Sequence, residues 1–215
     1  TGCGRVFVVF QPAEEGGAGA RAMLETAFLE GEDIRAFFAG HMHPELPLGH
    51  IGMSEGVTNA SSDTISIRLK GKGGHGAHPH LCIDPIVGGA HLVTALQTIV
   101  SRNISSADRA VLTIGRFHAG TAVNIIPHEA VLEGTLRTLS EPVRDQIVER
   151  IHVMVQGVAS AHRLTAEVTI TPGYPLVVNN KEIVHFTVRE ARSLLGEDRV
   201  HLQEPRMGAE DFAYF

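Results

Sequence analysis

The sequence predicts an α/β chain made of two parts, an outer part with buried strands and a compact unit inserted at roughly residues 61–172. Short apolar runs that end in polar residues indicate the buried strands of the outer part. Between residues 61 and 172, the strands alternate polar and apolar side chains, which is typical of a sheet with one wet face. A length of 215 residues with 43% hydrophobic content is sufficient for a sizeable core.

The outer part is predicted to begin with a strand, a helix and a second strand. Residues 5–10 (RVFVVF) are β-branched and aromatic, and they predict a buried strand that ends before Pro12. Residues 18–30 have apolar side chains at helical spacing, and Gly31 follows as a helix-end signal. Residues 34–39 predict a second buried strand. Both strands run into polar residues, and the ligands of open α/β sheets collect at that edge.

The inserted unit combines two long helical patterns with four strands. In chain order these six elements lie at 64–69, 84–101, 110–118, 129–138, 141–162 and 164–171. The order β-α-β-β-α-β is the ferredoxin-like arrangement, which predicts an antiparallel sheet with helices packed on one side.

The outer part is expected to resume after the inserted unit. The turn-forming residues from Pro172 onward mark the return, followed by a helix at 180–195 and a loop entering a helix at 206–215. We therefore expect a domain at 61–172 between two parts of another domain, at 1–60 and 173–215.

Charge and composition exclude several classes of function. A net charge of −6 and a pI of about 6.1 argue against binding to nucleic acid or to anionic lipid. No apolar run could span a membrane and no leader precedes Arg5, so a cytoplasmic location with Cys3 and Cys82 reduced is expected. The sequence has no glycine-rich nucleotide loop and no Gly-x-Ser-x-Gly elbow, which argues against a nucleotide cofactor and a serine nucleophile.

Two adjacent carboxylates, Glu14 and Glu15, follow the first predicted strand. A metal ion would offset their repulsion, with one glutamate as a ligand and the other, its pKa raised, as a general base. His41 and His43 follow the second predicted strand, and Glu15 with His41 would suit Zn or Mn. In the alternative interpretation the glutamates only stabilise the start of the next helix, and the histidines are structural.

Three polar residues of the inserted unit could contact a substrate. His75 lies in the glycine-rich segment 73–80, where one histidine reaching a substrate is expected rather than a separate zinc site. Asn124 interrupts an apolar run, and a buried amide needs a backbone or ligand partner. Arg137 could hold a carboxylate through two hydrogen bonds, or it could be an ordinary strand-surface residue.

Five segments, in this order and spacing, resemble the metal-dependent amidohydrolase family of hippurate hydrolases, N-acyl-amino-acid deacylases and indole-acetyl-amino-acid hydrolases. The segments are QPAEEGGAGA, GHMHPELPLG, LKGKGGHGAHPH, AVNIIPHEAVLEGTLRT and MGAEDFAYF. The resemblance implies a metallopeptidase-like α/β catalytic domain with an inserted ferredoxin-like lid and dimerisation domain. It also implies hydrolysis of the amide bond of N-acyl or N-aroyl amino acids.

The resemblance implies a metal centre in the outer part. Glu14 matches the family's general base, and Glu15 and His41 match metal ligands. The implied cofactor is two divalent metal ions, which could be Zn, Mn, Co or Ni.

The resemblance also implies roles for the inserted unit. His75 matches a histidine that, in dimeric relatives, reaches the partner subunit's site and stabilises the oxyanion. Asn124 and Arg137 match residues near the substrate, with Arg137 as the candidate for its carboxylate. The implied partners are a small N-acyl amino acid and a second copy of the chain, joined through residues 61–172.

The match to the family's ligand set is incomplete. The remaining ligands of the family lie upstream of Glu14 and downstream of the segment ending at Phe215. We therefore expect this chain to be a fragment that is inactive by itself. A dipeptidase or carboxypeptidase of the same family is one alternative, and a noncatalytic dimerisation module is another.

Overall fold

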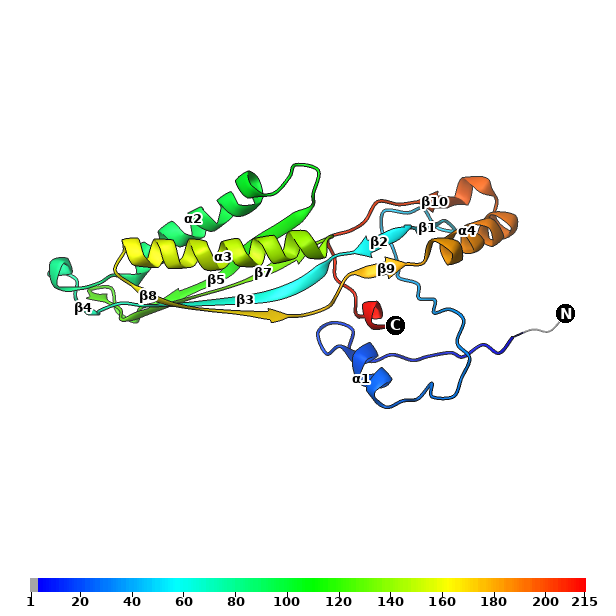
Figure 1. Cartoon of the computed structure of the whole chain (residues 1–215), viewed down its shortest axis with the longest axis horizontal. Helices are drawn as coiled ribbons and strands as arrows, with labels where there is room; N and C mark the ends of the chain where they lie inside the picture. The colour runs from blue at the N-terminus through cyan, green and yellow to red at the C-terminus, as the bar shows by residue number, and fades with distance from the viewer. Residues whose placement is uncertain (1–3) are drawn as a thin grey trace. The chain divides into compact units, whose positions relative to one another are not determined.

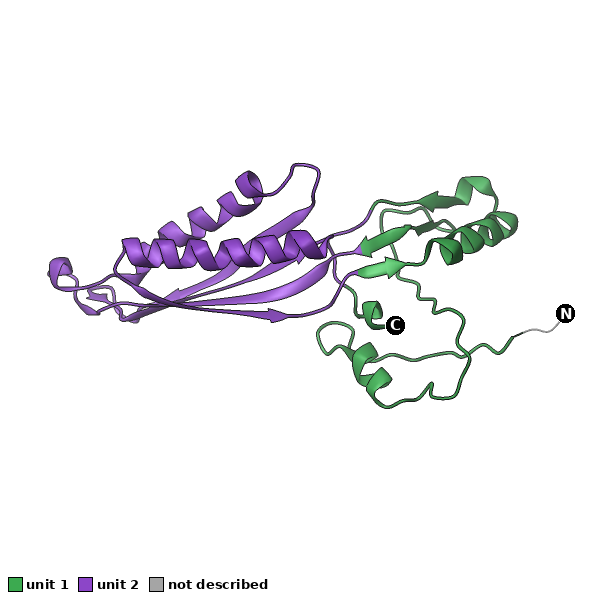
Figure 2. Cartoon of the chain, in the orientation of Figure 1, with its two compact units in different colours: residues 1–58, 177–204, 210–215 green, residues 59–176, 205–209 purple. Residues whose placement is uncertain are grey.

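The computed structural model describes residues 4–215, which form two compact units (Figure 2). Unit 1 contains the described residues up to Thr58 together with Val177–Glu204 and Glu210–Phe215. Unit 2 contains Asn59–Leu176 and Pro205–Ala209.

Unit 2 is a four-stranded antiparallel sheet covered by two helices (Figure 1). Its elements in chain order are β3 (Ser61–Lys70), α2 (Pro85–Asn103), β5 (Ala110–Ala119), β7 (Glu129–Thr138), α3 (Glu141–Ala161) and β8 (Thr165–Pro172). The strands lie side by side in the order β5-β7-β3-β8. The predicted β-α-β-β-α-β arrangement with an antiparallel sheet is therefore confirmed.

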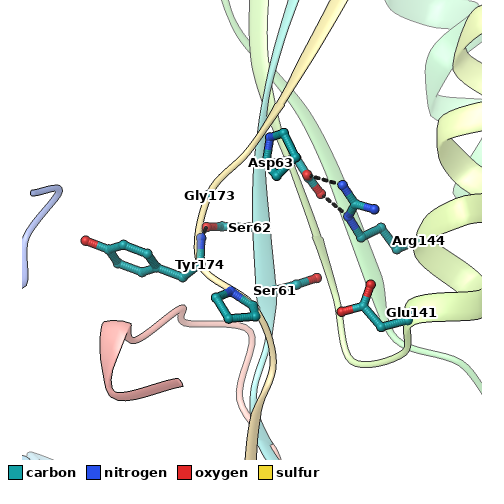
Figure 3. A pocket seen from close by; sticks show the side chains of 9 residues that line it. Ser61, Ser62, Asp63, Glu141, Arg144, Gly173 and Tyr174 are labelled. Atoms are coloured by element: carbon teal, nitrogen blue, oxygen red, sulfur yellow. Dashed lines mark hydrogen bonds and ion pairs between the residues drawn. The ribbon is translucent and has the colours of Figure 1, made fainter. Parts of the chain in front are cut away.

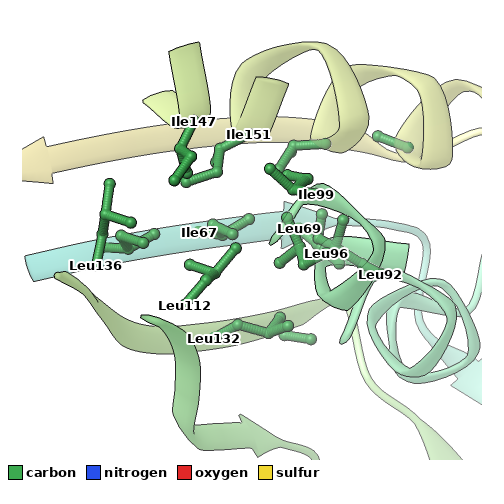
Figure 4. Close-up of a cluster of buried hydrophobic side chains, with 14 of the residues drawn as sticks. Ile67, Leu69, Leu92, Leu96, Ile99, Leu112, Leu132, Leu136, Ile147 and Ile151 are labelled. Atoms are coloured by element: carbon green, nitrogen blue, oxygen red, sulfur yellow. The ribbon is translucent and has the colours of Figure 1, made fainter. Parts of the chain in front are cut away.

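The core of unit 2 follows from the alternation that its strands show in the sequence. In β3, Ile65, Ile67 and Leu69 are fully buried. They pack with side chains from both helices, among them Leu92, Leu96, Ile99, Ile147 and Ile151 (Figure 4). The opposite face of the sheet is charged: Arg68 pairs with Glu129 and Lys70 pairs with Glu167. One face is thus dry and the other wet, as predicted.

Three short elements lie beside the ends of the unit 2 strands. They are β4 (Gly74–His75), η1 (Pro79–Leu81) and β6 (Ile125–Ile126). β4 pairs with β6 in antiparallel fashion, with Gly74 opposite Ile126 and His75 opposite Ile125. The next helix, α2, begins at Pro85, where the Asp84 side chain accepts hydrogen bonds from two backbone N–H groups.

Unit 1 has two small sheets and a second, smaller core. β1 (Ile51–Met53) pairs in parallel with β10 (Val200–Leu202), and β2 (Gly56–Asn59) pairs with β9 (Val177–Asn179). α4 (Lys181–Leu195) packs its apolar side chains on Val200. The other helical elements are α1 (Gly19–Glu25), η2 (Glu197–Arg199) and η3 (Asp211–Tyr214).

Three predictions for the outer part are wrong. Residues 5–10 and 34–39 form no strand, and several of their apolar side chains are largely exposed: Val6 at 88%, Phe10 at 87% and Phe38 at 64%. A strand needs a neighbour to complete its hydrogen-bond ladder, and within residues 4–215 no segment pairs with either run. The helix expected at 18–30 ends at Glu25, and residues 26–31 form turns instead.

Within residues 4–215, no helix combines the length and the apolar character needed to cross a bilayer. Cys82 is a buried free thiol, as expected, whereas Cys3 lies outside the described residues.

Candidate functional site

The predicted catalytic glutamates lie in a tight loop that leads into α1. Glu14 and Glu15 sit between Ala13 and Ala18, whose backbones are left-handed with φ values of 57° and 48°. The Gly17 N–H donates to the Ala13 carbonyl at 2.9 Å, which closes the turn around the two glutamates. At Gly19, a Cβ atom would lie 1.7 Å from the Pro12 carbonyl oxygen, so only glycine fits there. The glycines of this segment therefore shape the loop that carries the carboxylates.

Glu14 lies in an acidic environment that favours its protonated form. It is half-buried, and one of its carboxylate oxygens lies within 4.8 Å of one carboxylate oxygen of Glu210 and one of Asp211. Desolvation raises the pKa of Glu14, and the negative charges of Glu210, Glu15 and Asp211 raise it further, while His41 lowers it. A carboxylate with a raised pKa accepts a proton more readily near neutral pH, which suits a general base.

His41 and Glu15 present the donor atoms that a metal ligand needs. His41 Nδ1 lies 2.7 Å from the Met42 carbonyl oxygen, which can only accept, so Nδ1 carries the proton. The neutral ring therefore has a free lone pair on Nε2, and ligating histidines are commonly held in this way. Glu15 is exposed and offers carboxylate oxygens. This oxygen and nitrogen donor pair fits Zn, Mn, Co or Ni.

The structure does not gather Glu15 and His41 into one cluster with a third ligand. Within residues 4–215, the only three histidine, cysteine or acidic side chains with ligand atoms all within 4.8 Å are Glu14, Glu210 and Asp211. His43 lies in the same loop as His41, but its Nδ1 accepts a hydrogen bond from the Glu45 N–H at 3.1 Å.

His75 and Asn124 lie together at one end of unit 2. His75 in β4 is opposite Ile125 in β6, and the Gly76 N–H donates to the Asn124 carbonyl at 2.8 Å. The contact is close because Gly76 has no Cβ; one would lie 3.0 Å from the Asn124 carbonyl oxygen. Both side chains are exposed. The buried amide considered for Asn124 is therefore not observed, and its side chain points to solvent in unit 2.

His75 is held in the tautomer opposite to that of His41. Its Nδ1 accepts a hydrogen bond from the Ala77 N–H at 3.1 Å, so the proton of the neutral ring is on Nε2. The Nε2–H group can donate to an oxygen of a substrate. His78 and His80, the other histidines of this segment, are also exposed.

Arg137 lies near the opposite end of the same sheet. It is half-buried on β7, opposite Ser62, and its Nη1 donates to the Met207 carbonyl at 3.0 Å. β4 and β6 follow the other end of the sheet, where Glu129 is opposite Lys70. At about 3.3 Å per strand residue, the stretch of β7 from Arg137 to Glu129 alone spans roughly 25 Å, and His75 lies on β4, outside that stretch. The two side chains of one chain cannot contact the same small substrate.

A cavity of about 240 Å³ in unit 2 lies beside a buried ion pair (Figure 3). Asp63 accepts two hydrogen bonds from Arg144, 2.8 Å from Nε and 2.6 Å from Nη2. Next to this pair, the Ser62 hydroxyl accepts from the Tyr174 N–H at 3.1 Å. The two charges neutralise each other and link β3 to α3. We therefore interpret the ion pair beside this cavity as a contact that stabilises the fold.

Sequence reasoning missed three residues beside the loop of Glu14 and Glu15: Gln11, Glu210 and Asp211. Two of them belong to the MGAEDFAYF segment, which carried the family resemblance without an assigned role. That segment was the only indication in the sequence that these two residues matter. The fold shows in addition that they lie against the loop of Glu14.

Comparison with known proteins gives one family and relatives of about twice the length. Residues 2–215 match the model of peptidase family M20/M25/M40. The N-acetylcysteine deacetylase of Bacillus subtilis (strain 168) is 42% identical over 212 residues, which cover 99% of this chain and 55% of that protein. The N-acetyldiaminopimelate deacetylase of Bacillus licheniformis is 41% identical over 209 residues, covering 97% of this chain and 56% of that protein.

A solved structure agrees with these matches. The Bacillus subtilis YXEP protein, a dinuclear metal-binding peptidase of the M20 family, is similar with a TM-score of 0.76 and 35% identity. The similarity covers 95% of this chain and 50% of that one. The chain thus spans about half the length of the relatives it matches.

Proposed function

Because this chain belongs to peptidase family M20/M25/M40, we propose that it carries catalytic machinery for metal-dependent hydrolysis of N-acyl or N-aroyl amino acids. The products are a free amino acid and a carboxylic acid. The observation that carries the proposal is the contrast between the two adjacent glutamates. Glu14 is half-buried beside other carboxylates, and the pKa of Glu14 is raised, whereas Glu15 is exposed. Such a pair suits a base beside a ligand.

The names of the relatives support the substrate class. Two of them are deacetylases, one of N-acetylcysteine and one of N-acetyldiaminopimelate. Each name describes an amino acid that carries an acetyl group on nitrogen. We propose the same class for the enzyme that contains this chain, with a larger aroyl group as in hippurate as a second acyl type to test.

The proposed reaction assigns one task to each side chain. Glu15 and His41 would supply two of the ligands of the divalent metal ions, which, when bound, would acidify a water and polarise the amide carbonyl. Glu14 takes the proton of the water and passes it to the leaving amine. His75 donates its Nε2–H to the oxygen on which negative charge develops. Arg137 binds the substrate carboxylate, and Asn124 contacts the substrate beside His75.

We further propose that one active site draws on two copies of the chain. Within one unit 2, roughly 25 Å of strand, at about 3.3 Å per residue, separates Arg137 from the end of the sheet that β4 and β6 follow, where His75 and Asn124 lie. A small substrate held by Arg137 of one copy would therefore meet His75 and Asn124 of another. A homodimer formed through residues 61–172 supplies that arrangement, with this domain also acting as a lid.

The test is a substrate panel with the full gene product. N-acetyl amino acids, N-benzoylglycine and dipeptides are assayed before and after a chelator, and after Zn, Mn, Co or Ni is restored. We expect cleavage of acylated amino acids, loss of turnover on chelation and recovery with metal. Preferred cleavage of dipeptides favours the peptidase alternative. A lack of turnover on every substrate with every metal contradicts the proposal and favours a noncatalytic dimerisation module.

The 215-residue chain by itself is expected to be inactive. Within residues 4–215, Glu15 and His41 have no third ligand gathered with them, and two ligands do not hold a catalytic metal pair. Measurable turnover by the isolated chain would contradict this part of the proposal.

A further inference from the structure

We propose that Asp211 is a positioning residue whose buried carboxylate holds both ends of the loop that carries Glu14 and Glu15. This inference rests on the proposed function, because the position of the loop matters for catalysis only if those glutamates bind metal and move a proton.

Each oxygen of the Asp211 carboxylate binds a different end of the loop. Asp211 is fully buried, and its Oδ2 accepts a hydrogen bond from the Ala20 N–H at 3.0 Å. Its Oδ1 accepts from the side-chain amide of Gln11. Gln11 precedes the two glutamates and Ala20 follows them, whereas Asp211 is 191 residues away from Ala20 in the sequence. One side chain thus bridges the loop from outside, where η3 lies against α1 (Figure 1).

The loop has features that call for such an external contact. Ala13 and Ala18 both have left-handed backbones, which are unfavourable for residues with a Cβ atom and persist only where the surroundings enforce them. Ala18 is also the N-cap of α1, and its methyl side chain cannot accept a hydrogen bond from the first helical turn. Asp211 supplies an acceptor to that turn at Ala20.

Asp211 could instead act only through its negative charge near Glu14. Glu210 permits a comparison, because one of its carboxylate oxygens also lies within 4.8 Å of an oxygen of Glu14 and an oxygen of Asp211. Glu210 is half-buried, and its side chain accepts from the Phe212 N–H at 3.4 Å, inside its own turn. Removing the charge of Glu210 therefore changes the electrostatics around Glu14 and leaves the contacts of Asp211 with Gln11 and Ala20 in place.

Two substitutions of Asp211 separate contact from charge. Asp211→Ala removes both hydrogen bonds and the charge. Asp211→Asn removes only the charge, because its Oδ1 can still accept from the Ala20 N–H. Its NH₂ group can donate to Gln11 once that amide turns over. A positioning role predicts that the asparagine variant keeps its activity and the alanine variant loses it. A charge effect predicts that both variants lose activity equally.

The experiment compares Asp211→Ala, Asp211→Asn and Glu210→Gln in the full gene product. The readouts are hydrogen exchange at the Ala20 amide, bound metal per chain, and kcat and KM. We expect Asp211→Ala to speed exchange at Ala20 about tenfold or more, because a hydrogen bond to a charged acceptor is lost. Its kcat should fall about 10²-fold with KM little changed, since a small misplacement of catalytic groups has that effect.

The remaining outcomes decide the proposal. Asp211→Asn should stay within about threefold of the unmodified protein in exchange and kcat, because an amide retains both contacts. Glu210→Gln should leave exchange at Ala20 unchanged. Equal losses in both Asp211 variants, or unchanged exchange in Asp211→Ala, overturn the proposal.

Two further variants cover a failure to fold and a failure of the proposed function. If Asp211→Ala does not fold, Gln11→Ala removes only one of the two bonds and should lower kcat about tenfold; an unchanged kcat overturns the proposal. Glu14→Gln tests the proposed function separately. Full turnover in Glu14→Gln contradicts that function, whereas unchanged exchange in Asp211→Ala contradicts only the role of Asp211.

Discussion

Two histidine tautomers match the two different tasks proposed for those side chains. His41 donates from Nδ1 to the Met42 carbonyl, which leaves the Nε2 lone pair free for a metal ion. His75 accepts from the Ala77 N–H at Nδ1, which leaves an Nε2–H group to donate to an oxyanion. A ligand needs a lone pair and an electrophilic stabiliser needs a proton, and backbone groups one or two residues away select between them.

We predict that ¹⁵N NMR of the neutral rings shows His41 protonated on Nδ1 and His75 protonated on Nε2. His43 serves as the internal control, because its Nδ1 accepts from the Glu45 N–H in the same way as that of His75. It should therefore show the Nε2–H form. A proton on Nε2 of His41 in the metal-free protein would contradict the claim that the Nε2 lone pair of His41 is available to bind a metal ion.

Among secondary-structure elements, the sequence pattern was sufficient for unit 2 and insufficient for the outer strands. Each strand of the four-stranded sheet pairs with another strand within residues 61–172. The alternation of polar and apolar side chains in β3 and β7 therefore determines which face of the sheet is buried in the core. Residues 5–10 have an equally strong strand composition, but no described segment pairs with them. Strand composition shows that a segment is compatible with a sheet, but a strand forms only where a neighbouring strand completes the hydrogen-bond ladder.

The same reasoning explains which site residues could be predicted. Glu14, Glu15 and His41 stand in local motifs, so their chemistry is visible in a few neighbouring letters. Asp211 could not be assigned, because its role depends on contact with Gln11, 200 residues earlier in the chain. Periodicity and spacing carry no information about a contact of that kind.

The buried ion pair that joins β3 to α3 gives a prediction at this scale. Arg144→Ala leaves Asp63, with a side chain only 1% exposed, without its partner, and should lower the free energy of unfolding by about 3–5 kcal/mol. The control is Arg116→Ala, which breaks a largely exposed pair with Glu133 and should cost about 0–1 kcal/mol. Urea unfolding of both variants measures the difference, and equal costs would contradict a structural role for Asp63 and Arg144.

For the molecule as a whole, the placement of polar residues at both ends of unit 2 has a direct consequence. His75 and Asn124 lie beyond one end of the sheet, and Arg137 lies near the other. If all three serve one substrate, then two chains must contribute to each site. The assembly is thus part of the proposed chemistry and more than a means of stabilising the fold.

Mixing two inactive variants tests this arrangement. We predict that His75→Ala and Arg137→Ala are each poorly active alone, and that their mixed dimers recover activity. A heterodimer has one site with both residues intact, so complete exchange of subunits should restore about one quarter of the unmodified activity. The control mixes His75→Ala with Asn124→Ala, which lie at the same end and should not complement each other. No recovery in the first mixture would contradict a site shared between copies.

The most direct test of the account is the turnover of Glu14→Gln in the full gene product, with bound metal measured in the same sample. The amide keeps the shape of Glu14 but cannot take a proton, so kcat should fall about 10²–10⁴-fold while the metal content is retained. Glu25→Gln in α1 is the matched control, because Glu25 is exposed and paired only at the surface with Arg21, and kcat should not change. Turnover that survives in Glu14→Gln, with metal bound, would contradict the claim that this glutamate is the base of a metal-dependent hydrolase.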